Sequence, residues 1–409
     1  MVQTIFILIL AIITADFILE RILSLLNVKN ATLPIPLLLD GIYSEPEYKK
    51  QQLYFGINTK FGLITSTFSF IVILTVLLFG GFGWLDAWLQ MRFDNQIIIS
   101  LLFFGTLYIA NDIISIPFEW YDVFVIEEKF GFNKTTPKTF FLDRLKGYLL
   151  AIVIGGGILT LILWIYQLTP TYFWLLAWLS VTVFNLFMGL FYSNLIVPLF
   201  NKQTPLSEGK LRDAIRQFAD KAGFELKNIY VIDGSKRSTK ANAYFTGLGK
   251  KKRIVLYDTL INDLTVDEIV AVLAHEIGHY KHKHTQKNIL VSLLNSLVLF
   301  YIFGWLLKSD TLAQALGGNI ASFHLNTLAF GILYSPISSM LDIGMNALSR
   351  KFEYQADAFV KKFGIEKDLI IALKKISSKA LSNLTPHPAV VFVNYSHPTL
   401  LQRIVALKR

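Results

Sequence analysis

The sequence predicts a mostly α-helical protein that crosses a membrane seven times and carries a small cytosolic α/β portion. Of its 409 residues, 53% are hydrophobic and only 17% are charged, whereas soluble globular proteins carry about 25% charged residues. Residues 147–201 contain no charge at all and are long enough for two helices, since each membrane span needs about 20 apolar residues. This composition suits a surface that faces lipid.

Seven apolar segments are the predicted membrane helices, at 4–25, 61–85, 96–117, two within 147–201 on either side of a turn at 168–171, 288–307 and 311–341. The chain is therefore divided into four parts. We expect five membrane helices in 1–199 with cytosolic loops at 27–60 and 118–146, a cytosolic portion at 200–287, two more membrane helices in 288–348, and a C-terminal helical segment at 349–409.

Lysine and arginine predict the orientation, because loops rich in these residues stay in the cytoplasm. The loops at 27–60 and 118–146 carry four and five basic residues, and the alternate connections carry at most one each. We therefore expect the N-terminus outside and the 200–287 portion and C-terminus in the cytoplasm. The net charge of +10 is then explained by attraction to anionic lipid. Nucleic-acid binding is not expected, because no basic-aromatic recognition pattern accompanies the charge.

The portion at 200–287 has the pattern of a small α/β unit. An amphipathic helix is predicted at 206–222 and a strand at 228–233, where apolar residues alternate. Two β-prone runs at 242–248 and 253–258 are separated by Gly-Lys-Lys-Lys at 249–252, which indicates a hairpin. The outer strand of such a sheet could pair with an extended peptide.

A helix with metal-binding spacing follows. Thr265 and Glu268 form a capping box that begins it, and its interior carries His275-Glu276-Ile-Gly-His279. The two histidines are four apart, so they lie on one helical face and can share one zinc ion. Glu276 can reach a zinc-activated water and serve as general base for peptide hydrolysis. Two histidines on a solvated helix are the alternative, but composition alone produces this pattern in roughly 2% of such sequences or fewer.

The other potential ligands also lie late in the chain. There is no cysteine, so a metal must be held by histidine and carboxylate groups. All seven histidines fall in the last third: His275, His279, His282, His284, His324, His387 and His397. A catalytic zinc needs a third protein ligand, for which Glu353 is the best candidate. Asp357, four residues on, would accept the spare N–H of a ligand histidine. The alternative is an ordinary charged helix start in which Arg350 and Lys351 are the partners of these acids.

These motifs resemble the type I CAAX prenyl endopeptidases, which are gluzincin-type membrane zinc proteases that process farnesylated proteins. The resemblance rests on His-Glu-Ile-Gly-His at 275–279, Ser-Arg-Lys-Phe-Glu-Tyr-Gln-Ala-Asp at 349–357, Asn-Tyr-Ser-His-Pro at 394–398 with Arg403, Phe-Val-Ile-Glu-Glu at 124–128 followed by Gly-Phe-Asn at 131–133, Asn-Ala-Tyr at 242–244 and Pro-Leu-Phe-Asn at 198–201. These landmarks run from about residue 117 to the end of the chain.

The resemblance implies roles for individual residues and one zinc ion per chain. Glu353 becomes the third ligand, and His397 would hydrogen-bond the oxyanion. Asn242 and Ala243 would present an edge strand to the substrate backbone. Arg403 would lie near the site, either binding substrate or bracing Glu353. The fold implied is a ring of seven helices around an internal water-filled chamber that the zinc faces.

Such a chamber also offers a place for charges within the spans. Asp16, Glu20, Arg21 and Asp112 are costly in lipid, so we expect them to face the interior or to pair. Glu20 and Arg21 could instead lie at the membrane edge and snorkel. Because Asp16, Glu20 and Arg21 interrupt the first apolar stretch, we do not expect a cleavable signal there.

Three departures from the eukaryotic form predict a bacterial member. Phe130 stands where His is expected, the tail lacks a dilysine retrieval signal, and the loops are short. We therefore expect the bacterial inner membrane, or the endoplasmic reticulum for a eukaryotic chain. The expected enzyme is a monomeric zinc endopeptidase whose peptide substrate carries a C-terminal prenyl group or, alternatively, is a membrane quality-control target. A seven-span scaffold or transporter with a vestigial motif is the non-enzymatic alternative.

Overall fold

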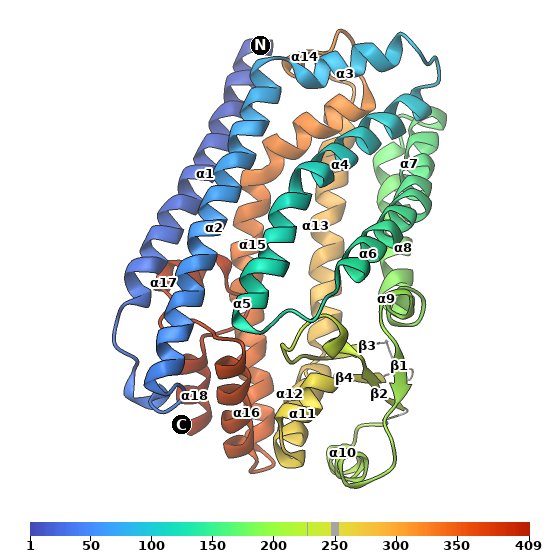
Figure 1. Cartoon of the computed structure of the whole chain (residues 1–409). Coiled ribbons are helices and arrows are strands. Elements are labelled where there is room, and N and C mark those ends of the chain that lie inside the picture. Colours follow the sequence, from blue (N-terminus) through green and yellow to red (C-terminus); the bar gives the residue numbers. More distant parts are fainter. Residues whose placement is uncertain (227, 247–252) are drawn as a thin grey trace.

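A computed structural model of the chain describes residues 1–226, 228–246 and 253–409. Seven of its helical segments are long and apolar enough to cross a membrane, which confirms the predicted multi-pass α-helical fold (Figure 1). They are built from α1 (Val2–Ala31), α2 (Glu45–Leu78), α4 (Gln96–Tyr121) with η2 (Asp122–Glu127) and α5 (Glu128–Phe130), α6 (Pro137–Leu150) with η3 (Ala151–Gly155) and α7 (Gly156–Leu168), α8 (Phe173–Leu195) with α9 (Val197–Phe200), α13 (His284–Leu306) and α15 (Phe323–Lys361).

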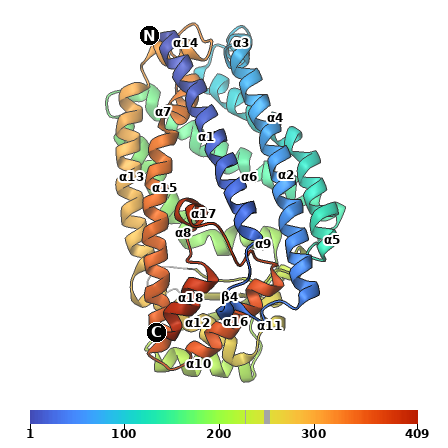
Figure 2. The ribbon, with the colours of Figure 1, turned by 90° about the vertical axis from the view of Figure 1, so that its left-hand side faces the viewer.

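Shorter elements cover both ends of the bundle. Helices α3 (Gly81–Gln90) and α14 (Asp310–Ala315) lie at the end that holds the N-terminus (Figure 1). At the opposite end lie η1 (Leu37–Leu39), α16 (Glu366–Lys379), α18 (Leu400–Lys408) and the segment 200–287, called the soluble portion below (Figure 2). Helix α17 (Pro388–Asn394) packs against α1 and α15.

The helices extend further than apolar composition predicted, so the expected loops at 27–60 and 118–146 are wrong in their bounds. Helix α2 begins at Glu45, where Ser44 and Glu47 form a capping box. Helix α6 begins at Pro137, and the Thr136 side chain accepts a hydrogen bond from its first turn. Apolar composition marks only the part of a helix that lies in hydrocarbon, whereas capping residues determine where the helix begins.

Helix α15 corrects the predicted boundary near residue 348. It runs without a break from Phe323 to Lys361, so the last membrane helix and the segment carrying Glu353 are one element. The predicted span at 311–341 instead begins with the separate helix α14, after which Gly317 adopts a φ of +87° that favours glycine. Because α15 is continuous, it projects Glu353 directly from the bundle toward the soluble portion.

The end of the bundle away from the soluble portion contains a buried polar network. His324 of α15 lies 2.7 Å from Oδ1 of Asp86 on α3 and 3.1 Å from Oγ of Ser100 on α4. All three side chains are buried, so their polar groups satisfy one another. Gly83 of α3 lies against the same region, and a Cβ there would lie 2.1 Å from the carbonyl oxygen of Gly317. This network holds α3, α4 and α15 together, and His324 therefore lies apart from the other histidines of the last third of the chain.

The charged residues within the spans have different surroundings, and whether Glu20 and Arg21 face the interior or snorkel to the membrane edge stays a prediction. Asp16 and Glu20 line a cavity of about 800 Å³ bordered by α1, α2 and α4. Asp112 forms an ion pair with Arg144 at 2.8 Å. Arg21 donates to the hydroxyl of Ser66 on α2. The larger chamber implied by the resemblance stays a prediction.

The soluble portion is built on a four-stranded sheet of order β1-β2-β4-β3. Its strands are β1 (Gln203–Pro205), β2 (Asn228–Ile232), β3 (Ala243–Thr246) and β4 (Arg253–Tyr257). Strands β2 and β4 are parallel, whereas β3 and β4 pair antiparallel, as the hairpin prediction requires. The predicted turn at 249–252 lies outside the described residues.

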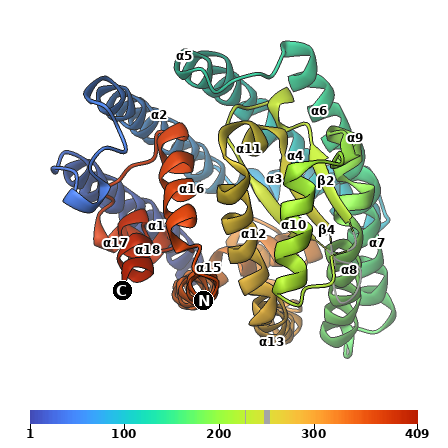
Figure 3. The same ribbon diagram turned by 90° about the horizontal axis from the view of Figure 1, so that it is seen from below.

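Three helices accompany this sheet: α10 (Lys210–Lys221), which is the amphipathic helix predicted at 206–222, α11 (Asp258–Asp263) and α12 (Val266–Lys281). Helices α10 and α12 pack against each other below the bundle (Figure 3). Ile269 and Leu273 of α12 join Ile254 and Leu256 of β4 in one buried cluster. The sheet is therefore fixed to the helix that carries the His-Glu-Ile-Gly-His motif.

Candidate active site

The close packing of α12 against α15 positions the site. The capping box predicted for α12 is present, and the helix turns His275 and His279 toward α15. Between them lies Gly278, where a Cβ would be 3.0 Å from Cα of Ala356 and from Cβ of Phe359. A larger residue there would push the helices apart. The glycine in the motif therefore lets the histidines approach the acidic residues of α15.

His275, His279 and Glu353 converge on one point. The Nε2 atoms of the two histidines lie 3.1 Å apart. Oε2 of Glu353 lies 3.3 Å from Nε2 of His275, and Oε1 lies 3.2 Å from Nε2 of His279. Three ligands of a tetrahedral zinc site with bonds of about 2.0–2.1 Å are separated by roughly 3.3–3.4 Å. The spacing of these atoms therefore fits a zinc ion, and two nitrogens with one carboxylate oxygen are donors that zinc accepts.

Hydrogen bonding shows why this point favours a cation. Nδ1 of His275 lies 2.9 Å from Oδ1 of Asp357, so Nδ1 carries the proton and Nε2 presents a lone pair toward Glu353. Oε2 of Glu353 is buried and makes no hydrogen bond within the described part of the chain. Burial lowers the pKa of His275, but the neighbouring carboxylates of Asp357 and Glu353 outweigh it and raise the pKa. The Nε2 lone pair of His275 and the Glu353 carboxylate both face this point. A cation bound there would be attracted to both and would remove the repulsion between them.

A second hydrogen-bonded chain orients His279, and sequence reasoning missed it. Nδ1 of His279 lies 3.0 Å from Nδ1 of His284, and Nε2 of His284 lies 2.8 Å from Oε1 of Gln355. If Gln355 accepts, each imidazole in turn donates, and Nε2 of His279 is left with its lone pair toward the ligand cluster. The spacing of five residues hides this pair, because Lys283, at a φ of 58°, separates α12 from α13. The clustering of histidines in the last third of the chain is the sequence signal that could have indicated the contact between His279 and His284.

Arg403 on α18 supports the acidic side of the cluster. It donates to both carboxylate oxygens of Asp357, at 2.6 Å and 2.9 Å. Its Nη1 lies 3.6 Å from Oε2 of Glu353. This bidentate geometry fixes the Asp357 carboxylate, which in turn orients His275. Arg403 therefore holds Asp357, and the two roles left open for it, binding substrate or bracing Glu353, both stay predictions.

Glu276 and His397 are the two candidate catalytic residues that are not among the three converging ligands. Glu276 is half-buried on α12, and its carboxylate forms no hydrogen bond or ion pair among the residues that the structure describes. Nδ1 of His397 lies 3.0 Å from Oε1 of Glu353, although 65% of its side chain is exposed. His397 also lines a cavity of about 490 Å³ between α16 and α18. His397 is thus next to Glu353 and accessible to a substrate, while Glu276 directly follows the ligand His275 in the chain.

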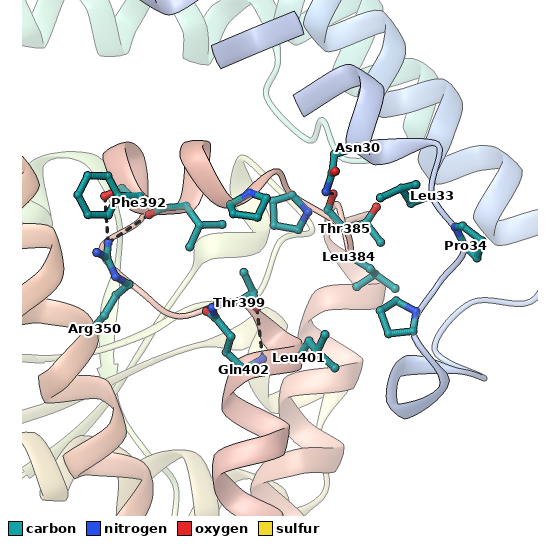
Figure 4. A pocket seen from close by; sticks show the side chains of 14 residues that line it. Asn30, Leu33, Pro34, Arg350, Leu384, Thr385, Phe392, Thr399, Leu401 and Gln402 are labelled. Carbon is teal, nitrogen blue, oxygen red and sulfur yellow. Dashed lines mark hydrogen bonds between the residues drawn. The ribbon is translucent and has the colours of Figure 1, made fainter. Parts of the chain in front are cut away.

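A second pocket adjoins this cavity through Leu384, Pro386 and Thr399, which line both. Its volume is about 470 Å³, and it lies between the end of α1 and helices α17 and α18 (Figure 4). Arg350 donates to the carbonyl oxygens of Val391 and Phe392 at its edge, at 3.1 Å and 3.4 Å (Figure 4). Arg350 is therefore a partner of the α17 backbone, and the alternative in which it pairs with Glu353 is not what the structure shows.

Asn242 and Ala243 are outside the ligand cluster. Asn242 is exposed and directly precedes β3, and Ala243 is the first residue of that strand. Strand β3 is the outermost strand of the sheet on the side opposite β1, and it contacts α8. The structure thus places both predicted substrate-binding residues at a sheet edge, close in sequence to the start of the edge strand.

Comparisons with known proteins agree with this arrangement. Residues 24–202 match the family described as "CAAX prenyl protease N-terminal, five membrane helices", and residues 205–409 match "Peptidase family M48". The CAAX prenyl protease 1 homolog of Arabidopsis thaliana is 34% identical over 400 residues, covering 96% of this chain and 94% of that protein. CAAX prenyl protease 1 of Saccharomyces cerevisiae is 35% identical over 399 residues, covering 91% of this chain and 88% of that protein.

A solved structure shows the same fold. The crystal structure of S. mikatae Ste24p superposes with a TM-score of 0.92 at 33% sequence identity, covering 98% of both chains. The predicted family is confirmed by these matches, whereas the bacterial origin stays a prediction. The chain belongs to the M48 peptidase family, in its CAAX prenyl protease 1 group, and is a membrane metalloendopeptidase.

Proposed function

We propose that the chain is a zinc-dependent endopeptidase that cleaves C-terminally prenylated, CAAX-type peptides at the cytoplasmic end of its membrane bundle. The observation that carries the proposal is the convergence of His275, His279 and Glu353, whose donor atoms all lie within 4.8 Å of one another. The metalloendopeptidase family supports the reaction, and the names of the relatives support the substrate class.

The proposed mechanism assigns a step to each side chain around the ligands. Zinc held by His275, His279 and Glu353 would supply Lewis-acid chemistry, polarising the peptide carbonyl and acidifying the attacking water. Glu276 removes a proton from that water as its oxygen bonds to the carbonyl carbon. As the C–N bond breaks, Glu276 returns the proton to the leaving amine. His397 donates a hydrogen bond to the carbonyl oxygen as negative charge develops there.

The substrate backbone is proposed to pair with the free edge of β3, beginning at Asn242 and Ala243. An extended peptide gains main-chain hydrogen bonds when it adds to a sheet edge. We further propose a monomer in a bacterial inner membrane, with the N-terminus outside. The termini lie at opposite ends of the bundle (Figure 1), as an odd number of spans requires, and the basic loops favour the soluble portion on the cytoplasmic side.

The function is tested with protein purified in detergent, zinc analysis and two fluorogenic peptides. One peptide ends in a farnesylated CAAX sequence, and the other is identical but carries no prenyl group. Wild-type protein with one zinc per chain is expected to cleave the prenylated peptide. Treatment with 1,10-phenanthroline should abolish cleavage, and added zinc should restore it.

The outcomes separate the parts of the proposal. Equal cleavage of both peptides would leave the endopeptidase in place and contradict the preference for prenylated substrates, which would favour quality control. Stoichiometric zinc without cleavage of either peptide would contradict the proposed substrate class. Cleavage that persists after the zinc has been removed would overturn the mechanism.

His397→Ala is expected to lower kcat by about 100-fold to 1,000-fold, the usual effect of removing an oxyanion donor. The zinc content should not change, because His397 contacts Glu353 without belonging to the three converging ligands. His397→Gln retains a hydrogen-bond donor and should recover part of the rate. Loss of zinc from both variants would show instead that His397 acts through Glu353.

A further inference from the structure

The segment between β2 and β3 is held against the membrane bundle by residues that the catalytic mechanism does not use. The backbone N–H of Thr239 donates to the carbonyl of Phe132 at 3.1 Å, and that of Lys134 donates to the carbonyl of Arg237 at 3.0 Å. Asn133 and Ser238 form an antiparallel bridge between the same two segments. The connection after α5 therefore forms a short extended pair with the chain that leads to β3.

Lys240 makes a charged contact at this junction, beside the ion pair of Arg237 with Asp143. Its Nζ lies 2.7 Å from Oε2 of Glu127 and 3.1 Å from Oη of Tyr54. The Tyr54 hydroxyl also donates to Oε1 of Glu127 at 2.5 Å. The ammonium lies 4.5 Å from the ring centre of Phe132. The Lys240 side chain is therefore held by Tyr54 of α2 and by Glu127 of η2, which continues α4.

This contact is partly shielded from solvent. The Lys240 side chain is 37% exposed and that of Glu127 is 18% exposed. Burial lowers the pKa of Lys240, but hydrogen bonds to Glu127 and Tyr54 outweigh it and raise the pKa. The ring of Phe132 and the hydroxyl of Tyr54 restrict where the Lys240 ammonium can lie beside Glu127. A solvated surface pair has no such restriction on its geometry.

Lys240 is also close to the start of the edge strand. Its carbonyl accepts a hydrogen bond from the Thr259 hydroxyl at 3.2 Å, and the carbonyl of Asn242 accepts one from the Tyr257 N–H at 3.1 Å. Strand β3 is paired with β4 on one side, and its other edge is the side on which a peptide would add. Its position relative to the bundle therefore depends on the residues that anchor its first end.

We propose that Lys240 is a positioning residue which, through Glu127 and Tyr54, fixes β3 relative to the membrane helices so that a substrate peptide pairs with it in register. The inference rests on the proposed function, in which the β3 edge binds the substrate backbone. It also gives a role to the Glu-Glu-Lys-Phe-Gly-Phe-Asn stretch at 127–133, which lies outside the ligand cluster.

The test compares kcat and KM for one cleavable peptide across Lys240→Gln, Glu127→Gln, the double variant and Lys240→Arg. Lys240→Gln should raise KM about tenfold and leave kcat within about threefold, because positioning affects binding of the peptide. The double variant should be no worse than either single variant, since both remove the same pair. Lys240→Arg should recover most of the binding. Lys379→Gln, which breaks the 3.2 Å pair with Asp263, is the matched control and should leave KM unchanged.

A second peptide separates positioning from a general loss of structure. When the backbone amides beside the cleaved bond are N-methylated, the peptide cannot pair with a strand, so its KM should be high in wild type and change less than about twofold in Lys240→Gln. An equal increase of KM for both peptides, or additive effects of the two single variants, would overturn the inference. Failure of the proposed function would be seen separately, as a wild-type protein that cleaves neither peptide.

Discussion

Replacement of Glu276 by Gln is expected to abolish peptide cleavage while the metal stays bound. The amide has nearly the size of the carboxylate but cannot take a proton from water. Glu276 lies on α12 between the two histidines in sequence, yet it is not one of the three converging ligands. Removing a positioned general base costs about 100-fold to 10,000-fold in rate, and we expect the upper part of that range because Glu276 has two proton transfers to perform.

The measurement is kcat for the prenylated peptide together with zinc per chain for each variant. Asp267→Asn is the matched control, since it removes an exposed carboxylate from the first turn of the same helix and should change kcat little. A Glu276→Gln variant that still cleaves at the wild-type rate would exclude Glu276 as the base. One that lost its zinc would show that this carboxylate helps to hold the metal.

The parts of the site that the sequence predicts are those encoded locally. A capping box at Thr265 and Glu268, followed by helical periodicity, places His275 and His279 on one face without any tertiary information. Local pattern does not determine the roles of Glu353 and Asp357, because their approach to α12 depends on how two distant helices pack at Gly278. The motif resemblance supplied that information, and the structure shows the contact that the spacing alone could not.

Other contacts had no local pattern to reveal them. His284 follows His279 by five residues, a spacing that does not place two side chains on the same face of one helix. The two rings meet because the chain changes direction at Lys283. Lys240 and Glu127 are separated by 113 positions, and neither stands in a metal-binding or nucleophilic motif. Helix bounds were missed for a different reason, since hydrophobicity reports where lipid lies and not where backbone hydrogen bonding ends.

Glu353→Gln is expected to lose zinc far more severely than Asp357→Asn. Glu353 is the anionic member of the ligand cluster, and its carboxylate is buried with 3% of the side chain exposed. With a neutral amide there, two imidazoles would have to hold a dication in a buried site next to Arg403. We expect the zinc affinity to fall by more than about a hundredfold, beyond the range usual for residues that only orient a ligand, and cleavage to fall with it.

Asp357→Asn should lower zinc affinity by only about 10-fold to 100-fold, the range typical of a partner that orients a ligand histidine. The amide oxygen can still accept from Nδ1 of His275, but Arg403 loses the anionic partner of its bidentate contact. Competition with a chromophoric chelator gives both affinities, and activity in zinc-buffered solution shows whether excess metal restores each variant. Because excess zinc can refill a site with intact ligands, Asp357→Asn should regain most of its rate and Glu353→Gln should not. The reverse order of affinities would mean that Asp357 is the ligand and Glu353 the orienting group.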